Sequence, residues 1–308
     1  MNYRHAYHAG NFADVLKHAV LMLCLNYLKL KAAPFRVIDT HAGAGRYRLD
    51  QDEAAKTGEW HHGIGRLVGP DAASMPQVAA ELLAPYLAAV AAANPDGGLK
   101  NYPGSPVLAQ GALRAGDTLL ANELQFDEAA ALRRALGNDK SCKVSSIDGY
   151  AALKAHLPPK ERRGLVLIDP PFEEPGELIR MTEGLGEGLK RFATGIYVLW
   201  HPIKDEKPVA RFHRGVGEVV MAAGLPPPLD VQLMLRPARN PTLLNGAGLV
   251  IVNPPFKLAE NLGALLPVLA DRLGDGGKGA YNLGAIKPQA RNTTSGIRVP
   301  RRLTDLPD

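Results

Sequence analysis

One tetrapeptide of the chain, Asp169-Pro170-Pro171-Phe172, joins a carboxylate to a stiff turn and an aromatic ring. It follows Leu165-Val-Leu-Ile168, an apolar run typical of a buried strand. Neither proline has an N–H, and both have φ fixed at about −65°, so the carbonyls of the turn can face a ligand. A carboxylate and a proline carbonyl can hold the two hydrogens of an exocyclic amine, while the ring offers a face for an extruded base.

An exocyclic amine needs such help because its lone pair is drawn into the ring of the base. Acceptors that hold the two hydrogens return the lone pair to the nitrogen. The order Asp-Pro-Pro-aromatic is typical of enzymes that methylate an exocyclic amino group. We therefore predict that Asp169, Pro170 and Phe172 are catalytic, and that Phe172 also binds the substrate base. The alternative is a strand that ends in a structural Pro-Pro turn.

A second copy, Asn253-Pro254-Pro255-Phe256, also follows an apolar run and is another accepted form of the motif. Position along the chain separates the two copies. The strand before Asp169 is the fourth, after strand-like runs at 35–39, 118–123 and 143–148. The fourth strand is where an amino-methylating motif belongs in this kind of α/β fold. Two more strand candidates, at 195–199 and 231–235, precede Asn253 and put it near the far edge of the sheet. We interpret the second copy as a structural turn.

The first strand leads into Asp39-x-x-x-Gly43-x-Gly45, which resembles the cofactor loop of S-adenosylmethionine (SAM) methyltransferases. Glycines in such a loop let the backbone approach the ligand. A nicotinamide fingerprint would require a third glycine where the chain has Arg48, which argues against a dinucleotide. Acids end the next two strands. Glu123 suits a ribose diol, and Asp148 suits the adenine amine of the cofactor.

Composition limits the class of protein. The 308 residues are 46% hydrophobic, which suffices for one large α/β domain or for one domain with an insertion. The net charge of +5 is a moderate basic excess, compatible with a phosphate-rich partner. No apolar stretch approaches membrane length and the first residues are not a signal peptide, so we expect a cytoplasmic protein without a membrane partner. Only Cys24 and Cys142 occur and the nine histidines are scattered, so we expect no disulfide framework and no metal site.

The expected fold is α/β, a Rossmann-like class I SAM-dependent methyltransferase domain with an inserted helical subdomain. The domain is discontinuous, because its predicted parts are 1–46 and 102–285, separated by the insertion at 47–101. The stretch after the glycine loop is far longer than a βαβ unit needs. Within it, residues 75–93 are rich in alanine and leucine and should be helical.

Local signals mark the other elements. Asn11 predicts the start of a helix that runs to about Lys31, and Ser105 is the predicted N-cap of the crossover helix after the insertion. The aromatic and basic segment before Asn11, which contains Tyr3, is either a frayed terminus or a lid over the pocket; we favour the lid. Residues 286–308 form a basic tail without periodicity, for which we expect disorder.

Longer segments make the comparison more specific. The chain resembles the bacterial 23S ribosomal RNA adenine-N6 methyltransferase J (RlmJ) family, over residues 3 to about 256. The segments that carry the resemblance are 3–11, 13–18, 39–47, 102–106, 162–165, 168–171 and 190–197.

The resemblance implies SAM-dependent N6-methylation of a specific adenine in 23S ribosomal RNA, with S-adenosylhomocysteine as product. It implies a catalytic Asp169 that also contacts the cofactor, and a Tyr3 that meets the RNA. The implied cofactor-binding residues are His18, His41, Gly43, Ser105, Glu123, Asp148 and Gly149.

Two alternatives remain open from the sequence. The motif specifies only an exocyclic amine, so a DNA adenine-N6 or cytosine-N4 methyltransferase would also fit. A non-catalytic RNA-binding protein on a methyltransferase scaffold is the second, although it would be free to lose Asp169 and the glycine loop. We expect the chain to act as a monomer.

Overall fold

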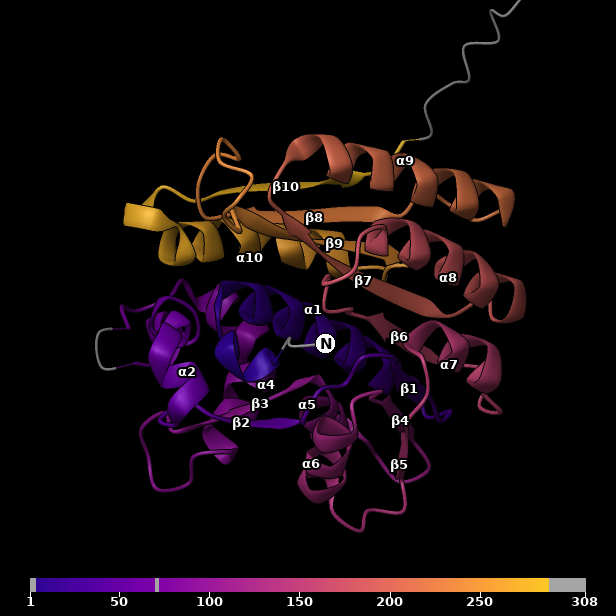
Figure 1. The fold of residues 1–308 in the computed structure, drawn as a ribbon, viewed down its shortest axis with the longest axis horizontal. Coiled ribbons are helices and arrows are strands. Elements are labelled where there is room, and N and C mark those ends of the chain that lie inside the picture. Colours follow the sequence, from indigo (N-terminus) through magenta and orange to yellow (C-terminus); the bar gives the residue numbers. More distant parts are fainter. Residues whose placement is uncertain (1–3, 70–71, 288–308) are drawn as a thin grey trace, which may run out of the picture.

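The computed structural model describes residues 4–69 and 72–287, so Tyr3 and the tail from residue 288 lie outside the described residues. Its centre is an eight-stranded sheet in the order β10-β8-β9-β7-β6-β1-β4-β5 (Figure 1). The strands are β1 (Arg36–Asp39), β4 (Thr118–Asn122), β5 (Cys142–Ser145), β6 (Gly164–Ile168), β7 (Ile196–Ile203), β8 (Leu229–Met234), β9 (Gly246–Val252) and β10 (Ala280–Ala285). A separate antiparallel pair is formed by β2 (Arg46–Arg48) and β3 (Asn101–Pro103).

The directions of the strands identify the fold. β5, β4, β1, β6 and β7 run parallel, whereas β9 is antiparallel to both of its neighbours, β7 and β8. β10 is added at the edge, antiparallel to β8. Counted along the sheet without β2, β3 and β10, the order is 3-2-1-4-5-7-6 with the seventh strand reversed. This is the Rossmann-like class I methyltransferase arrangement, and it confirms the expected fold class.

The order of the strands also places the ligand crevice. β1 lies between β4 and β6, so the chain continues to one side of β1 first and crosses to the other side later. In open α/β sheets, ligands bind outside the carboxyl ends of the strands at such a switch point. The ends of β1, β4 and β6 are Asp39, Asn122 and Ile168. The glycine loop, Glu123 and Asp169 follow these ends directly.

Helices cover both faces of the sheet. α7 (Gly149–His156), α8 (Glu177–Arg191) and α9 (Glu206–Ala222) cover one face, and their apolar side chains form one core cluster with it. The other face carries a larger cluster under α1 (Phe12–Lys29), α5 (Ser105–Ala112), α6 (Phe126–Leu136) and α10 (Leu258–Leu273). Within the described residues, no helix is both long and apolar enough to cross a membrane.

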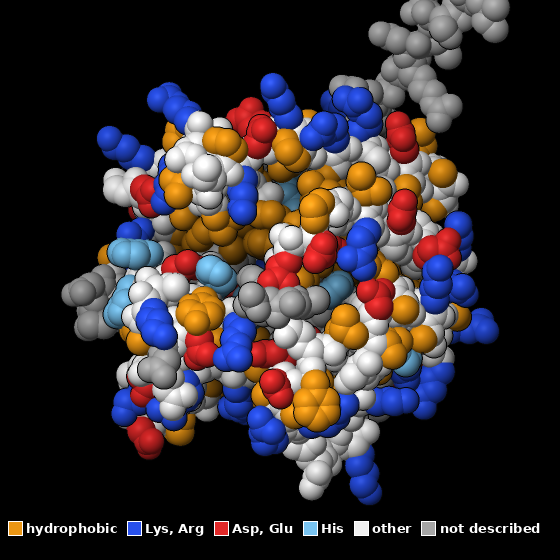
Figure 2. Space-filling model, viewed as in Figure 1, with side chains coloured by type: hydrophobic (Ala, Val, Ile, Leu, Met, Phe, Trp, Pro, Cys, Tyr) orange, Lys and Arg blue, Asp and Glu red, His pale blue; other side chains and the backbone are white. Residues whose placement is uncertain are grey.

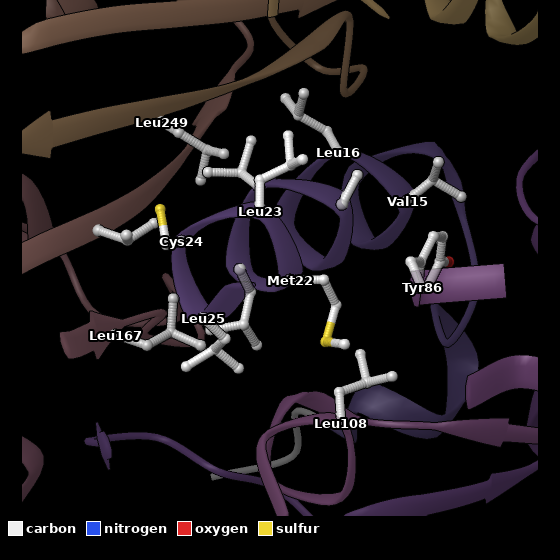
Figure 3. Close-up of a cluster of buried hydrophobic side chains, with 14 of the residues drawn as sticks. Val15, Leu16, Met22, Leu23, Cys24, Leu25, Tyr86, Leu108, Leu167 and Leu249 are labelled. Carbon is white, nitrogen blue, oxygen red and sulfur yellow. The ribbon is translucent and has the colours of Figure 1, made fainter. Parts of the chain in front are cut away.

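α1 is buried on nearly all sides. It begins where predicted, because the Asn11 side chain accepts hydrogen bonds from the backbone N–H groups of Ala13 and Asp14. Fifteen of its eighteen residues are buried, which is the pattern of a helix inside a core rather than on a surface. Figure 3 shows Leu167 of β6 and Leu249 of β9 facing it, with side chains of other helices around it. Charged residues of α1 must therefore be paired or must face a cavity.

The segment between β2 and β3 holds α2 (Asp52–Thr57), α3 (Gly65–Val68) and α4 (Gln77–Ala92), with a short 3-10 turn (Glu59–His62) between α2 and α3. α4 is the helix expected over 75–93. Its Leu83 and Tyr86 are fully buried in the same core cluster as α1. The segment thus shares the main hydrophobic core, and its description as a subdomain remains our interpretation.

Candidate active site

A cleft opens at the carboxyl ends of β1, β4 and β6. It holds about 1070 Å³ of space not filled by protein, including the part open to solvent. All the residues predicted to bind a cofactor line this cleft, as does Pro170: His18, His41, Gly43, Ser105, Glu123, Asp148, Gly149 and Asp169. The structure therefore brings together residues that are up to 151 positions apart.

Among the predicted site residues that the structure describes, Phe172 is the exception. Its backbone has a positive φ of 53°, and its ring meets Trp200 edge-on with 5.5 Å between the ring centroids. The ring packs against the core under α8 and is not part of the cleft lining. Its role as a stacking face for the substrate base stays a prediction.

Asp169 is held by a lysine that the sequence analysis did not assign to the site. Lys17 Nζ donates to Asp169 Oδ2 at 2.5 Å and lies 2.8 Å from Asp14 Oδ1. The Lys17 side chain is only 5% exposed, so its ammonium group is shielded from solvent and lies between two carboxylates. One signal was available. Asp14, Lys17 and His18 are spaced i, i+3 and i+4 in an otherwise apolar helix, which places them on one face.

This arrangement fixes the charge states of the group. Burial alone would lower the pKa of Lys17, but the carboxylates of Asp14 and Asp169 hold it well above its usual range. Burial would raise the pKa of Asp14, but His5 and Lys17 hold it well below its usual range. His5 Nε2 lies 2.9 Å from Asp14 Oδ2, which also accepts from the Gly10 N–H. Lys17 is therefore a permanent cation beside Asp169.

His18 ends a chain of buried hydroxyl groups. Its Nδ1 lies 2.7 Å from the Tyr102 hydroxyl, which lies 2.8 Å from the Tyr86 hydroxyl. Burial lowers the pKa of His18 to about 3, so the ring is neutral. If Tyr86 donates to Tyr102 and Tyr102 to Nδ1, the His18 proton is on Nε2. That tautomer suits the Asp14 oxygen 3.9 Å away and leaves a buried Nε2–H, otherwise without a partner, at the cleft.

The glycine loop is closed by Glu123. Its Oε2 accepts from the Gly43 N–H at 2.9 Å, and its Oε1 accepts from the Gln125 N–H at 2.8 Å. Gly43 has a φ of +60°, a region that favours glycine. Behind the loop, the Ser105 hydroxyl donates to Asp39 Oδ2 at 2.7 Å. The N-cap of α5 is Gly104, so the prediction that Ser105 is the N-cap is wrong. The Ser105 hydroxyl serves Asp39 instead.

Two further groups complete the wall of the cleft. Asp148 is the N-cap of α7, because its Oδ1 accepts from the N–H groups of Tyr150 and Ala151, and its Oδ2 accepts from Arg180 at 3.1 Å. A Cβ added to Gly149 would lie 2.3 Å from His41 Nε2, so only glycine leaves room for that imidazole. Burial lowers the pKa of His41 to about 4, which keeps the ring neutral.

The cleft is acidic although the chain is basic. Its lining contains two cationic side chains, Lys17 and Arg180, against seven carboxylates: Glu123, Glu128, Asp148, Asp169, Glu173, Glu174 and Glu177. Figure 2 shows many lysine and arginine side chains around the rim of the face drawn, and acidic side chains both at the rim and near its centre. An acidic pocket on a basic surface suits a cationic small molecule inside and a polyanion outside.

The second Pro-Pro turn lies elsewhere. β9 is antiparallel to β7, and Val252 pairs with Tyr197 at the start of β7. Asn253 therefore lies at the amino ends of the parallel strands, whereas Asp169 lies at their carboxyl ends. It donates two hydrogen bonds of 2.8 Å, to the carbonyls of Ala193 and Gly195, which agrees with a structural turn. The expected position near the far edge of the sheet is wrong, because β9 lies between β7 and β8.

Comparisons with known proteins agree with this geometry. The family described as "Ribosomal RNA large subunit methyltransferase D, RlmJ" matches residues 32–286. The chain is 40% identical to the Ribosomal RNA large subunit methyltransferase J proteins of Escherichia coli K12 and Haemophilus influenzae, over 94% of this chain and 100% of each relative. A crystal structure of a Legionella pneumophila protein superposes with a TM-score of 0.81 at 31% identity, over 90% of this chain and 98% of that one.

Proposed function

Because the chain belongs to the RlmJ family of ribosomal RNA large subunit methyltransferases, we propose that it methylates N6 of a specific adenine in 23S ribosomal RNA. One observation carries the choice of the catalytic group. Asp169 follows β6, lines the cleft together with Pro170, and is held there by Lys17. This position supports Asp169 and the Pro170 carbonyl as the acceptors for an exocyclic amine.

SAM is the methyl donor in this proposal, and the cleft fits it. Its sulfonium and ammonium groups are cations, which suit a pocket with an excess of carboxylates. Asp39 Oδ1 is a buried oxygen without a hydrogen-bond partner beside this pocket, and burial raises the pKa of Asp39 to about 6. A cationic ligand nearby would offset the free-energy cost of burying the charged form of Asp39. The Nε2–H of His18 would serve the carboxylate of the ligand, Glu123 its ribose hydroxyls, and Asp148 its adenine amine.

When bound, SAM supplies an electrophilic methyl group, and the protein supplies alignment. Lys17 occupies Asp169 Oδ2, so Oδ1 is the oxygen that would accept one hydrogen of the target amine. The Pro170 carbonyl would accept the other. The carboxylate need not deprotonate a neutral amine: it accepts a hydrogen bond before transfer and a proton once the nitrogen has become cationic. Positioning of this kind is worth about 7–11 kcal/mol in favourable cases.

The RNA would bind outside the cleft. The basic excess favours phosphates. The N-terminal segment would act as a lid, which is supported by His5 in the lining of the cleft and by the 3.0 Å contact of His8 Nδ1 with Glu59. We expect Tyr3 and Phe172 to contact the target base. The inserted subdomain at 47–101 would make further contacts with the RNA. We expect a monomer that acts in the cytoplasm. Family membership argues against the DNA methyltransferase and the non-catalytic RNA-binding protein.

The test is methyl transfer from labelled SAM to a 23S ribosomal RNA fragment, followed by mass mapping of N6-methyladenosine. Asp169→Asn keeps the size of the side chain and should abolish transfer while SAM binding, measured by calorimetry, is largely kept. Asn253→Ala, at the other Pro-Pro turn, is the matched control and should retain full turnover. Equal loss in two folded variants, or faster methylation of duplex DNA at the same salt, would overturn the proposal.

A further inference from the structure

Three side chains outside the cleft form a cluster with the composition of a metal site. His201 is on β7, His213 on α9 and Asp230 on β8, and one ligand atom of each lies within 4.8 Å of the others. His201 and Asp230 are buried, 0% and 6% exposed. None of the three lines the cleft. The cluster lies on the sheet face covered by α9 and has no part in the proposed methyl transfer.

Two of the distances within the cluster fit tetrahedral coordination, and the third pair of ligand atoms, on His201 and Asp230, lies within 4.8 Å. His201 Nε2 and His213 Nε2 are 3.4 Å apart, and His213 Nε2 and Asp230 Oδ1 are 3.5 Å apart. A tetrahedral zinc ion with bonds of about 2.0–2.1 Å holds its ligand atoms about 3.3–3.4 Å apart. Bonds of the same length at right angles, as in octahedral iron sites, would bring them to about 3.0 Å. We infer that His201, His213 and Asp230 bind a zinc ion, with water as the fourth ligand.

The surrounding groups hold two of the ligands in the required orientation. Asp230 Oδ2 accepts from Gln232 Nε2 and Asn282 Nδ2, each at 2.8 Å. Asp230 Oδ1 is buried without a hydrogen-bond partner, as expected of an oxygen that coordinates a metal ion. His201 Nδ1 faces the Pro202 carbonyl at 3.4 Å, which directs the lone pair of Nε2 toward His213. Such contacts from the other atom of each ligand are usual around metal sites.

The backbone also makes room for the cluster. His201 pairs with Gly248 across β7 and β9. A Cβ at position 248 would lie 2.3 Å from His201 Nε2, so any other residue there would displace the imidazole. Hydrogen bonding alone accounts poorly for the arrangement. A single N–H of His213 would be shared between two acceptors at 3.4 and 3.5 Å, the long limit for such bonds. Zinc would tie α9 to β7 and β8.

The experiment uses the full chain, freed of metal with a chelator and then titrated with zinc chloride. Calorimetry should give one zinc per chain, and the melting temperature should rise by roughly 5 °C at a hundredfold excess over Kd. His213→Ala and Asp230→Asn should each lose both effects. His62→Ala removes an exposed histidine elsewhere and is the matched control, which should bind zinc as the wild type does.

Cobalt provides a spectroscopic check, because a tetrahedral cobalt site with nitrogen and oxygen ligands absorbs visible light strongly. We expect this absorption in the wild type and in His62→Ala, displaced by zinc, and its absence in Asp230→Asn. Ferrous iron, added without oxygen, should bind more weakly than zinc. Equal zinc affinity in wild type and folded His213→Ala, no zinc bound at all, or a preference for iron would overturn the assignment.

Discussion

Replacement of Lys17 by methionine tests how the catalytic carboxylate is held. Methionine keeps the length and the apolar part of the side chain but removes the cation between Asp14 and Asp169. Since Nζ lies 2.8 Å from one carboxylate oxygen and 2.5 Å from the other, the two oxygens are at most about 5.3 Å apart. At an effective dielectric constant of about 20, two unit charges at that separation repel by about 3 kcal/mol. Loss of one partner of a buried ion pair costs a similar amount, about 3–5 kcal/mol.

Lys17→Met should therefore lower the free energy of unfolding by about 3 kcal/mol, measured by urea denaturation. Turnover on the ribosomal fragment at saturating SAM should fall at least about a hundredfold, because misplacement of a reacting group by about 1 Å has that effect. The double variant Asp14→Asn, Lys17→Met removes the unbalanced charge and should recover most of the stability but little of the turnover. Full turnover in the double variant would show that Lys17 only stabilises the fold. Unchanged stability in Lys17→Met would refute the electrostatic reasoning.

Asp148→Ala should weaken SAM binding about tenfold by calorimetry and cost about 1 kcal/mol of stability, whereas Asp205→Ala, which uncaps α9, should cost stability alone. Burial raises the pKa of Asp39 from 3.8 to about 6, so the folded chain holds the proton more tightly and stability should fall by about 3 kcal/mol as pH rises through this window. Asp39→Asn should flatten that part of the urea-denaturation profile against pH. Asn253→Ala should lose about 2–3 kcal/mol, since two hydrogen bonds disappear and alanine must adopt a φ of 52°, with turnover unchanged. Tyr86→Phe should weaken SAM about fivefold through the His18 tautomer, with turnover at saturating SAM unchanged.

The sequence predicted the parts of the site that depend on local order along the chain. Glu123, Asp148 and Asp169 each follow a strand, and parallel strands bring their carboxyl ends to one edge of the sheet. The order of the strands then separated Asp169 from Asn253. These positions needed only the pattern of apolar runs and turns, because the topology of the fold converts them into a cleft.

Other features depend on contacts between distant elements. The spacing of Asp14, Lys17 and His18 indicates a shared helix face but not what that face contacts. Lys17 becomes part of the site only because α1 is buried against β6. His201, His213 and Asp230 are separated along the chain by a helix and a loop, so the histidines looked scattered and we expected no metal. The direction of the Phe172 ring depends on Trp200, a neighbour across β6 and β7. Side-chain orientation after a turn is set by packing, and the tetrapeptide alone does not fix it.

The burial of α1 has a consequence for synthesis of the chain. This helix is made before every strand of the main sheet, and β9, whose Leu249 covers it, is made more than 200 residues later. At about 5–20 residues per second, roughly 10–40 s pass between the synthesis of α1 and that of β9. The nascent chain therefore exposes an apolar, aggregation-prone helix for most of its translation. A chaperone that binds the nascent chain should therefore matter more for the yield of this protein than for a methyltransferase in which no buried helix precedes the first strand.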